Sequence, residues 1–282
     1  MTVAVVTDSS ADLPADLAAA SGITVVPLSI RFGDEELVDG RDLTPTEFWA
    51  RCAASSVLPE TSAPSPGAFE AAFRTAGGGA AGGGAAGVVC VNLSSKLSAT
   101  IQAANAAAAA VEGEIRVRVV DSRSVTMGLG MIVLAAARAG ATTDDVEAVA
   151  AVATEAAGRT RVYGTLDTLE NLKKGGRIGA AQALLGSFLS VKPTIEVRDG
   201  EVEPGPKLRT RARALEWLAA KVIDDAPVGD VAVISGQAPD VDTFTALLAA
   251  SLPAERLVLA DLGAVIGTHA GPRTLGVAYQ VS

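Results

Sequence analysis

Short apolar runs rich in valine and isoleucine alternate along this chain with longer segments rich in alanine and leucine. β-Branched runs of this length are typical of buried strands, whereas the longer segments have the length of helices. Their alternation predicts an α/β fold with largely parallel strands. The expected strands are Val3–Thr7, Thr24–Ile30, Val88–Asn92, Ile115–Val120, Arg161–Leu166, Thr194–Arg198, Val231–Ser235, Arg256–Ala260 and Leu275–Tyr279. The expected helices are Pro14–Ala20, Pro45–Ala54, Pro66–Thr75, Ser98–Glu112, Thr126–Arg138, Asp144–Ala157, Leu169–Lys174, Ala180–Leu189, Thr210–Asp224 and Val241–Leu252.

The length of 282 residues favours two domains, because a single domain commonly holds about 100 to 200 residues. The composition changes near Gly158, where an alanine-rich helix ends and a segment with more basic residues and glycines begins. We therefore expect an N-terminal domain over 1–158 and a C-terminal domain over 159–282.

The formal net charge of −9 opposes non-specific attraction to nucleic acid or to anionic lipid surfaces. We therefore expect no nucleic-acid partner. The N-terminus, MTVAVVTDSS, has no basic region and reads as a first strand rather than as a signal peptide. No uninterrupted apolar run is long enough for a membrane helix. These features predict a cytoplasmic protein without membrane insertion.

Small hydroxyl side chains gather at strand ends and helix starts in four segments. In an open α/β sheet, ligands bind beyond the carboxyl ends of the strands, where helix N-termini offer free N–H groups. Hydroxyls collected there can hold an anion. The alternative is that each hydroxyl caps a helix, but a cap uses one side chain and leaves a neighbouring hydroxyl unexplained. The segments are TDSSADLP (Thr7–Pro14), ETSAPSP (Glu60–Pro66), NLSSKLSAT (Asn92–Thr100) and VVDSRSVTMGLG (Val119–Gly130).

His269 is the only histidine, and it lies in a glycine-rich stretch that we expect to be a loop before the last strand. Such a loop allows close backbone approach to a ligand, although a purely structural histidine is the alternative. Cations gather in LENLKKGGRIG and in PGPKLRTRAR. Lysines at a helix C-terminus complement the macrodipole. Arg177 and Arg209, beside glycine or proline turns, are better candidates for contacting an anion or an acidic partner.

Several kinds of chemistry lack their usual motifs. The chain has no G-x-S-x-G elbow and no G-x-x-x-x-G-K-[ST] phosphate loop, and one histidine with two dispersed cysteines argues against a zinc site. We therefore expect no cofactor and no metal. Two alternatives stay open: a lipid hydrolase or acyltransferase that uses Ser94 or Ser95 with His269, and an acidic scaffold that binds only proteins through its basic loops.

The ordered motifs resemble those of the DegV family. They are TDSSADLP, TSAPSPGAF, LSSKLSATIQAA, DSRSVTMGLG, LENLKKGGRIG, VKP, KLRTRARA and THAGP, and they span Thr7 to about Tyr279. Members of this family bind fatty acids, and some serve as the acyl-carrying subunit of a bacterial fatty acid kinase. The resemblance implies a long-chain fatty acid as ligand, a kinase subunit as partner and no catalysis by the chain itself.

The resemblance also implies a set of head-group residues. Thr61 of the T-S-x-P motif, with Ser62 beside it, is expected to hydrogen-bond the fatty acid carboxylate. A serine of the S-S-x-L-S motif, here Ser95 with Ser94 as its neighbour, is expected to do the same. His269 of the late H-x-G motif is expected to assist at the head group.

Arg177 and Arg209 are similar to family residues near the mouth of the site, where the kinase subunit docks. Two positions depart from the family pattern: Ala99 stands within the usual S-G-T motif, and Arg273 stands where glycine is common. The fold implied is a Rossmann-like N-terminal α/β domain and a smaller C-terminal α+β domain, with a ligand tunnel between them.

Overall fold

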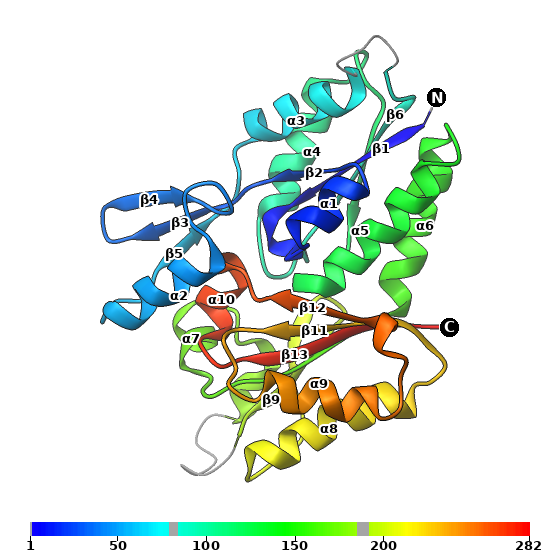
Figure 1. Cartoon of the computed structure of the whole chain (residues 1–282). Helices are drawn as coiled ribbons and strands as arrows, with labels where there is room; N and C mark the ends of the chain where they lie inside the picture. Colours follow the sequence, from blue (N-terminus) through cyan, green and yellow to red (C-terminus); the bar gives the residue numbers. More distant parts are fainter. Residues whose placement is uncertain (1, 79–83, 185–191) are drawn as a thin grey trace.

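The computed structural model describes residues 2–78, 84–184 and 192–282, and it contains three β-sheets with helices between and around them (Figure 1). The first sheet has the strand order β2-β1-β6-β7, and all of its neighbouring strands are parallel. Its strands are β1 (Val3–Asp8), β2 (Ile23–Val26), β6 (Gly87–Asn92) and β7 (Val117–Asp121). This part of the chain has the predicted α/β fold.

Helices cover both faces of the first sheet, which explains why its central strands are continuously apolar. Every residue of β6 is buried. One face packs on α3 and α4 around Phe69 and Phe73, and the other packs on α5 and α6. These helices are α3 (Pro66–Gly78), α4 (Thr100–Ala110), α5 (Thr126–Gly140) and α6 (Val146–Arg159); the short helices η1 (Ser9–Ala11) and α1 (Ala15–Ala20) follow β1.

The second sheet has six strands in the order β10-β9-β8-β13-β11-β12, and only the β11–β12 pair is parallel. Its outer face packs on α8 and α9 around Tyr163 and Tyr279. The strands are β8 (Thr160–Thr165), β9 (Thr194–Arg198), β10 (Glu201–Pro204), β11 (Val228–Ser235), β12 (Leu257–Asp261) and β13 (Leu275–Val281). The helices of this half are α7 (Glu170–Lys174), η2 (Gly179–Leu184), α8 (Arg211–Asp224), α9 (Val241–Ala249), η3 (Ala254–Arg256) and α10 (Ala264–Ala270).

A third, antiparallel sheet has the order β4-β3-β5 and was not predicted. Its strands are β3 (Ser29–Phe32), β4 (Glu35–Val38) and β5 (Glu60–Ser62), with α2 (Pro45–Ala54) between β4 and β5. The expected single strand Thr24–Ile30 is wrong because the chain leaves the first sheet at Pro27, which has no N–H to continue the ladder. The following residues pair instead with β4 and β5.

The two halves of the chain share α5. Leu129 and Ile132 on this helix pack in the core under the first sheet, whereas Met127 and Met131 pack in a core against the second sheet. A helix that is apolar on all sides is buried on all sides, and Figure 1 shows α5 lying between the sheets. The first sheet ends before α5 and the second begins at β8, next to the predicted division at residue 158.

Most predicted elements are confirmed, including the helix starts at Thr44 and Ser65. Thr44 forms a capping box with Glu47, and the Ser65 hydroxyl accepts from the N–H of Ala68. The short strands β4, β5 and β10 were missed because they are mostly polar. The expected helix Ala180–Leu189 is a 3-10 helix over Gly179–Leu184, and the rest of it lies outside the described residues.

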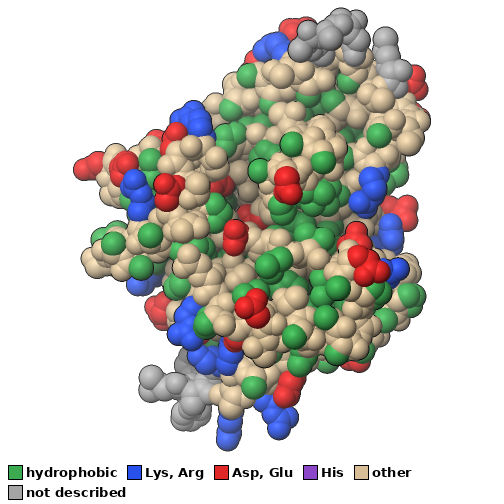
Figure 2. All heavy atoms as spheres, in the orientation of Figure 1, with side chains coloured by type: hydrophobic (Ala, Val, Ile, Leu, Met, Phe, Trp, Pro, Cys, Tyr) green, Lys and Arg blue, Asp and Glu red, His purple; other side chains and the backbone are tan. Residues whose placement is uncertain are grey.

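Among the described residues, no helix has the length and apolar character needed to cross a membrane. Basic and acidic side chains are interspersed on the face shown in Figure 2, and the surface is hollowed where the two halves meet. A large single-sign basic patch, the usual feature of a nucleic-acid surface, is not present on this face.

Candidate functional site

An apolar cavity of about 180 Å³ lies where all three parts of the fold meet. Its lining side chains come from the first half, from the small sheet and from the C-terminal half. Most of them are aliphatic, and the polar exceptions are Thr61, Ser98, Arg177 and His269. The aliphatic members include Leu28, Leu93, Leu97, Val125, Leu172, Ile195, Val197, Val202, Val265 and Ile266.

Thr61 reaches this cavity because of its register in β5. It pairs with Ile30 of β3, a fully buried residue, whereas the neighbouring Ser62 pairs with Ser29. Since successive side chains of a strand point to opposite faces, Thr61 faces inward and Ser62 faces outward. Ser62 is exposed and does not line the cavity.

His269 lies in helix α10 rather than in a loop, so the expected glycine-rich loop is wrong. The glycine at 267 is needed for packing, because a Cβ there would lie 2.8 Å from the ring of Phe48 in α2. Nε2 of His269 lies 3.1 Å from the Thr61 hydroxyl oxygen. Its Nδ1 is buried against Gly175 and has no hydrogen-bond partner among the described residues.

The electrostatic surroundings keep His269 neutral. Burial, and then the positive charge of Arg177, lower the pKa of the imidazole to about 4. The ring is therefore uncharged at neutral pH, with a proton on one nitrogen only.

Arg177 joins the two halves beside this pair. Its Nε donates to the carbonyl oxygen of Leu97 at 3.1 Å, and its Nη1 donates to the carbonyl of Gly175 at 2.6 Å. The guanidinium is half-buried and lines the cavity. It therefore places a positive charge next to His269 and fixes the backbone that precedes Ser98.

The structure does not bring Ser94 or Ser95 to the cavity. The Ser95 hydroxyl is exposed and donates to Asp121 at 2.5 Å, and the backbone N–H of Ser95 also donates to Asp121. The Ser94 hydroxyl is fully buried and donates to the carbonyl of Gly200 at 2.6 Å. A turn over residues 95–97 directs these two serines away from Thr61 and places Ser98 on the cavity side.

Ser98 is the hydroxyl of this segment that lines the cavity. Its oxygen accepts from the N–H of Thr100 at 3.2 Å, at the start of α4, and lies 2.9 Å from the Thr100 hydroxyl. The departure at Ala99 places a small exposed residue at the N-cap of α4 and leaves this arrangement intact.

Further upstream, a buried carboxylate holds the start of the same segment. Asp8 at the end of β1 accepts from the N–H of Leu93 at 3.0 Å and from the Asn92 side chain at 3.1 Å. It also accepts from the hydroxyl and N–H of Ser10. Complete burial nevertheless raises the pKa of Asp8. The TDSSADLP segment thus holds the backbone at Asn92 and Leu93, and Leu93 lines the apolar cavity.

Arg209 is exposed and is not among the residues that line this site, the cavity that contains Thr61 and His269. Arg273, which stands where the family commonly has glycine, adopts φ 60 and pairs with Asp167 at 3.3 Å. The loop after α10 therefore accommodates an arginine in a left-handed conformation.

A second cavity of about 570 Å³ shares Thr61, Arg177 and His269 with the apolar one. The rest of its lining is the segment 56–60 together with Asn171, Lys174, Gly175 and Thr268. These three shared residues, all polar, mark the end of the apolar cavity that faces this second space; Ser98 lines the apolar cavity alone. A ligand group held at Thr61 can be reached from there.

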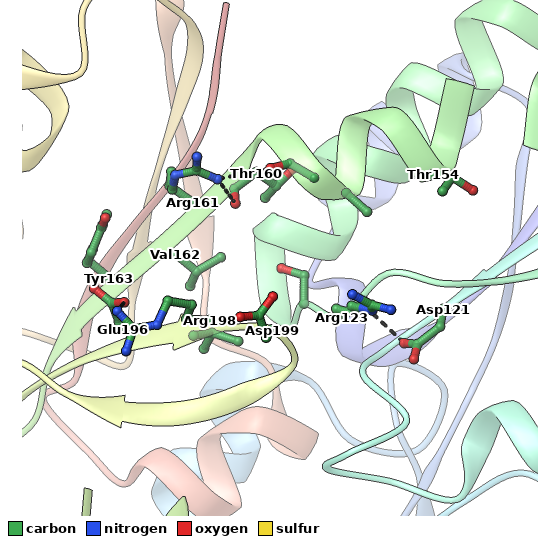
Figure 3. A pocket seen from close by; sticks show the side chains of 14 residues that line it. Asp121, Arg123, Thr154, Thr160, Arg161, Val162, Tyr163, Glu196, Arg198 and Asp199 are labelled. Carbon is green, nitrogen blue, oxygen red and sulfur yellow. Dashed lines mark hydrogen bonds and ion pairs between the residues drawn. The ribbon is translucent and has the colours of Figure 1, made fainter. Parts of the chain in front are cut away.

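A third cavity, of about 680 Å³, lies between α6 and the strands β8 and β9 (Figure 3). It is lined by charged side chains that include Arg161, Arg198, Glu196 and Asp199. Arg198 pairs with Glu196 at 3.0 Å. The polar walls of this third cavity are unsuited to an alkyl chain, whose binding is favourable only when it leaves water for apolar surroundings.

Ser98 and the aliphatic lining were not predicted from the sequence. The sequence feature that could have indicated Ser98 is its position three residues after Ser95, where a tight turn over residues 95–97 has reversed the chain. Spacing alone does not show which hydroxyl of such a turn faces inward. The lining residues come from segments far apart in the chain, and no local pattern groups them.

Comparisons with known proteins agree with these features. The family described as "Uncharacterised protein, DegV family" matches residues 2–282. A DegV domain-containing protein of Streptomyces coelicolor is 43% identical over 98% of this chain and 97% of its own length.

Solved structures extend the likeness to the fold. A DegV family protein from Thermus thermophilus, described as fatty acid binding, superposes with a TM-score of 0.88 at 36% identity and covers 100% of both chains. DegV of Bacillus subtilis, described as a fatty acid binding protein, superposes with a TM-score of 0.85 at 29% identity, again over 100% of both chains. By sequence and by fold, the chain belongs to the DegV family.

Proposed function

We propose that this protein binds a long-chain fatty acid, with the alkyl chain in the apolar cavity and the carboxylate at Thr61, Ser98 and His269. The observation that carries the proposal is the composition of that cavity: aliphatic walls with hydroxyls, one neutral histidine and one arginine as its polar members. Relatives at 36% and 29% identity that are described as fatty acid binding support it.

The alkyl chain supplies most of the affinity. Each methylene moved from water into apolar surroundings contributes about 0.8 kcal/mol. The carboxylate, by contrast, loses hydration on entering and must be compensated by donors. Hydroxyl donors and the guanidinium of Arg177 provide this compensation at the polar end.

The state of His269 decides which way the Thr61 hydroxyl points. Nδ1 has no acceptor among the described residues, so the neutral ring carries its proton on Nε2. Nε2–H then donates to the Thr61 oxygen. The Thr61 proton is consequently free to donate into the cavity, where it suits an acceptor such as a carboxylate.

The cavity widens when a long chain binds. Its volume of about 180 Å³ is below the range of roughly 300 to 1,000 Å³ that is usual for small-molecule sites. We expect the aliphatic side chains between α7, α10 and β9 to move apart. Because a bound acid stabilises the folded state, protection of these elements from hydrogen exchange should rise when a fatty acid is added.

We further propose that the bound acid is presented to a separate kinase in the cytoplasm. The carboxylate oxygen would form a bond to the terminal phosphorus of ATP held by the kinase, and the bond to ADP would break. The second cavity supports this proposal, because it reaches Thr61 and His269 and carries Lys174 beside Arg177. Both cations are suited to an incoming phosphoryl group.

Native mass spectrometry of protein purified from cells tests fatty acid binding. The expected result is a co-purified fatty acid that the variant Thr61→Val with Ser98→Ala loses. A wild-type protein that stays empty after incubation with excess palmitate would refute the proposal. Presentation to a kinase is tested separately, by adding ATP, Mg²⁺ and a candidate kinase and trapping an acyl phosphate with hydroxylamine.

The alternative of a serine hydrolase finds less support. Such an enzyme needs a serine within hydrogen-bond reach of its histidine and an acid that orients the ring. Ser95 donates to Asp121 instead, and His269 contacts Thr61 and has no acid partner on Nδ1 among the described residues. Covalent labelling of Ser94 or Ser95 by a fluorophosphonate would reverse this conclusion.

A further inference from the structure

Ser94 has a role that ligand contact does not explain. It is fully buried, and each of its polar atoms is used. Its N–H donates to the carbonyl of Ser124, and its carbonyl accepts from the N–H groups of Leu97 and Ser98. Its hydroxyl accepts from the N–H of Lys96 at 3.2 Å and donates to the carbonyl of Gly200 at 2.6 Å.

The bond to Gly200 crosses between the two halves of the chain. Gly200 lies in the turn between β9 and β10, with φ +86. A Cβ at this position would lie 2.5 Å from the Ser94 hydroxyl oxygen, so only glycine lets the turn approach this closely. Asp199 of the same turn and Arg123 of the segment after β7 both line the third cavity (Figure 3).

Further contacts tie the same segment to the C-terminal half. The carbonyl of Leu97 accepts from Arg177, and Lys96 pairs with Glu201 at 3.7 Å. The last of these is exposed and contributes little. Two contacts of the segment Ser94–Ser98 reach the β9–β10 hairpin: the exposed ion pair of Lys96 and the hydrogen bond of the Ser94 hydroxyl. Only the second of these is buried.

Resting on the proposed function, we infer that Ser94 is a positioning residue for the ligand head group. By fixing the segment Ser94–Ser98 against the β9–β10 turn, it places the Ser98 hydroxyl at the polar end of the apolar cavity. The N–H of Ser98 bonds directly to the carbonyl of Ser94, so a shift of Ser94 is passed on to Ser98. Ser94 itself does not touch the ligand.

A head-group comparison tests this role. The dissociation constants of palmitate and of hexadecanol, which share one alkyl chain, are measured by displacement of a fluorescent fatty acid. We expect Ser94→Ala to reduce the preference for the acid by roughly tenfold, the effect of one hydrogen bond to a charged group, while hexadecanol affinity stays unchanged. Ser98→Ala should have the same effect, and the double variant should lose no more than either single variant.

The control is Lys96→Gln, which removes the exposed ion pair between the same two segments. It should keep the wild-type preference for the acid. Ser94→Cys retains the size of the side chain with a weaker donor, so it carries the test if the alanine variant does not fold. Its preference should fall between those of the wild type and Ser98→Ala.

Two results would overturn the inference: a wild-type acid preference in Ser94→Ala or Ser94→Cys, or losses that add in the double variant. Failure of the proposed function looks different. In that case the wild-type protein itself would bind neither ligand, or would show no preference for the acid.

Discussion

The hydroxyl oxygen of Thr61 lies 3.1 Å from Nε2 of His269, although 208 residues separate them in the chain. The strand β5 and the helix α10 bring the two side chains together at the polar end of the apolar cavity. The imidazole is neutral and its other nitrogen is unpartnered among the described residues. If Nε2 carries the ring proton, the hydroxyl proton of Thr61 is free to donate into the cavity.

Removing that proton should weaken fatty acid binding. Thr61→Val keeps the shape of the side chain but has no donor, and we expect about ten- to a hundredfold weaker palmitate binding, as for one hydrogen bond to a charged acceptor. Thr61→Ser retains the hydroxyl and should stay close to wild type. Titration against a fluorescent fatty acid measures the palmitate affinity of both variants. Equal affinities of Thr61→Val and the wild type would remove Thr61 from the site.

Replacing each of two serines in the LSSKLSAT segment should affect fatty acid binding differently. Ser98→Ala should weaken palmitate binding by about tenfold, because Ser98 lines the apolar cavity. Ser95→Ala should leave binding within about twofold of wild type, because its hydroxyl is exposed and donates to Asp121. The same displacement titration compares them. The reverse order of effects would restore the assignment to Ser95 made from the motif.

The pH dependence of stability should carry opposing contributions from His269 and from buried carboxyl groups such as Asp39. His269 has a pKa of about 4 in the fold against an ordinary value of 6.5. Between these values the folded state binds fewer protons than the unfolded state, so this group makes stability rise with pH. Burial raises the pKa of Asp39 from 3.8 to about 6. Between those values the folded state binds more protons, so Asp39 makes stability fall as pH rises.

Single variants separate the two contributions. Urea unfolding of Asp39→Asn should show a steeper rise of unfolding free energy between about pH 4 and 6 than the wild type shows. The two slopes should differ by at most about 1.4 kcal/mol per pH unit, the limit for one proton. His269→Gln should show a shallower rise or a fall. Parallel pH profiles for the wild type and both variants would contradict the pKa values assigned to Asp39 and His269.

Two glycine-to-alanine changes should act in opposite directions. Gly200→Ala places a Cβ 2.5 Å from the Ser94 hydroxyl at φ +86, and we expect a loss of about 1 to 3 kcal/mol in unfolding free energy. Gly158→Ala lies within α6, where an added Cβ meets nothing within 4 Å. That variant should gain roughly 0.4 to 1 kcal/mol through helix propensity and unfolded-state entropy. Urea denaturation measures both, and an unaffected Gly200→Ala would show that the turn tolerates a side chain.

The sequence alone predicted the layered α/β architecture, because its signals are local. The buried run of β6 and the amphipathic helices beside it can be recognised without knowledge of their partners. Helix caps are equally local, as the capping box of Thr44 and Glu47 shows. The ordered motifs likewise indicated the DegV family, which the match over residues 2–282 confirms.

Other features depended on tertiary packing. The glycines around His269 suggested a loop, yet the residue lies in helix α10, and Gly267 is needed there for close packing of the helix on Phe48. Thr61 and Ser62 are adjacent hydroxyls in the sequence, and only the pairing of β5 with β3 decides that Thr61 faces inward.

The amino-acid sequence by itself determined the elements, the family and the surplus of hydroxyls near the strand ends. Only the tertiary structure decided that Ser98 faces the apolar cavity, while Ser94 holds the other half of the chain and Ser95 binds Asp121. The reason is physical: a local pattern fixes which backbone conformation is favourable, but the direction of a side chain in a turn depends on which distant backbone packs against it.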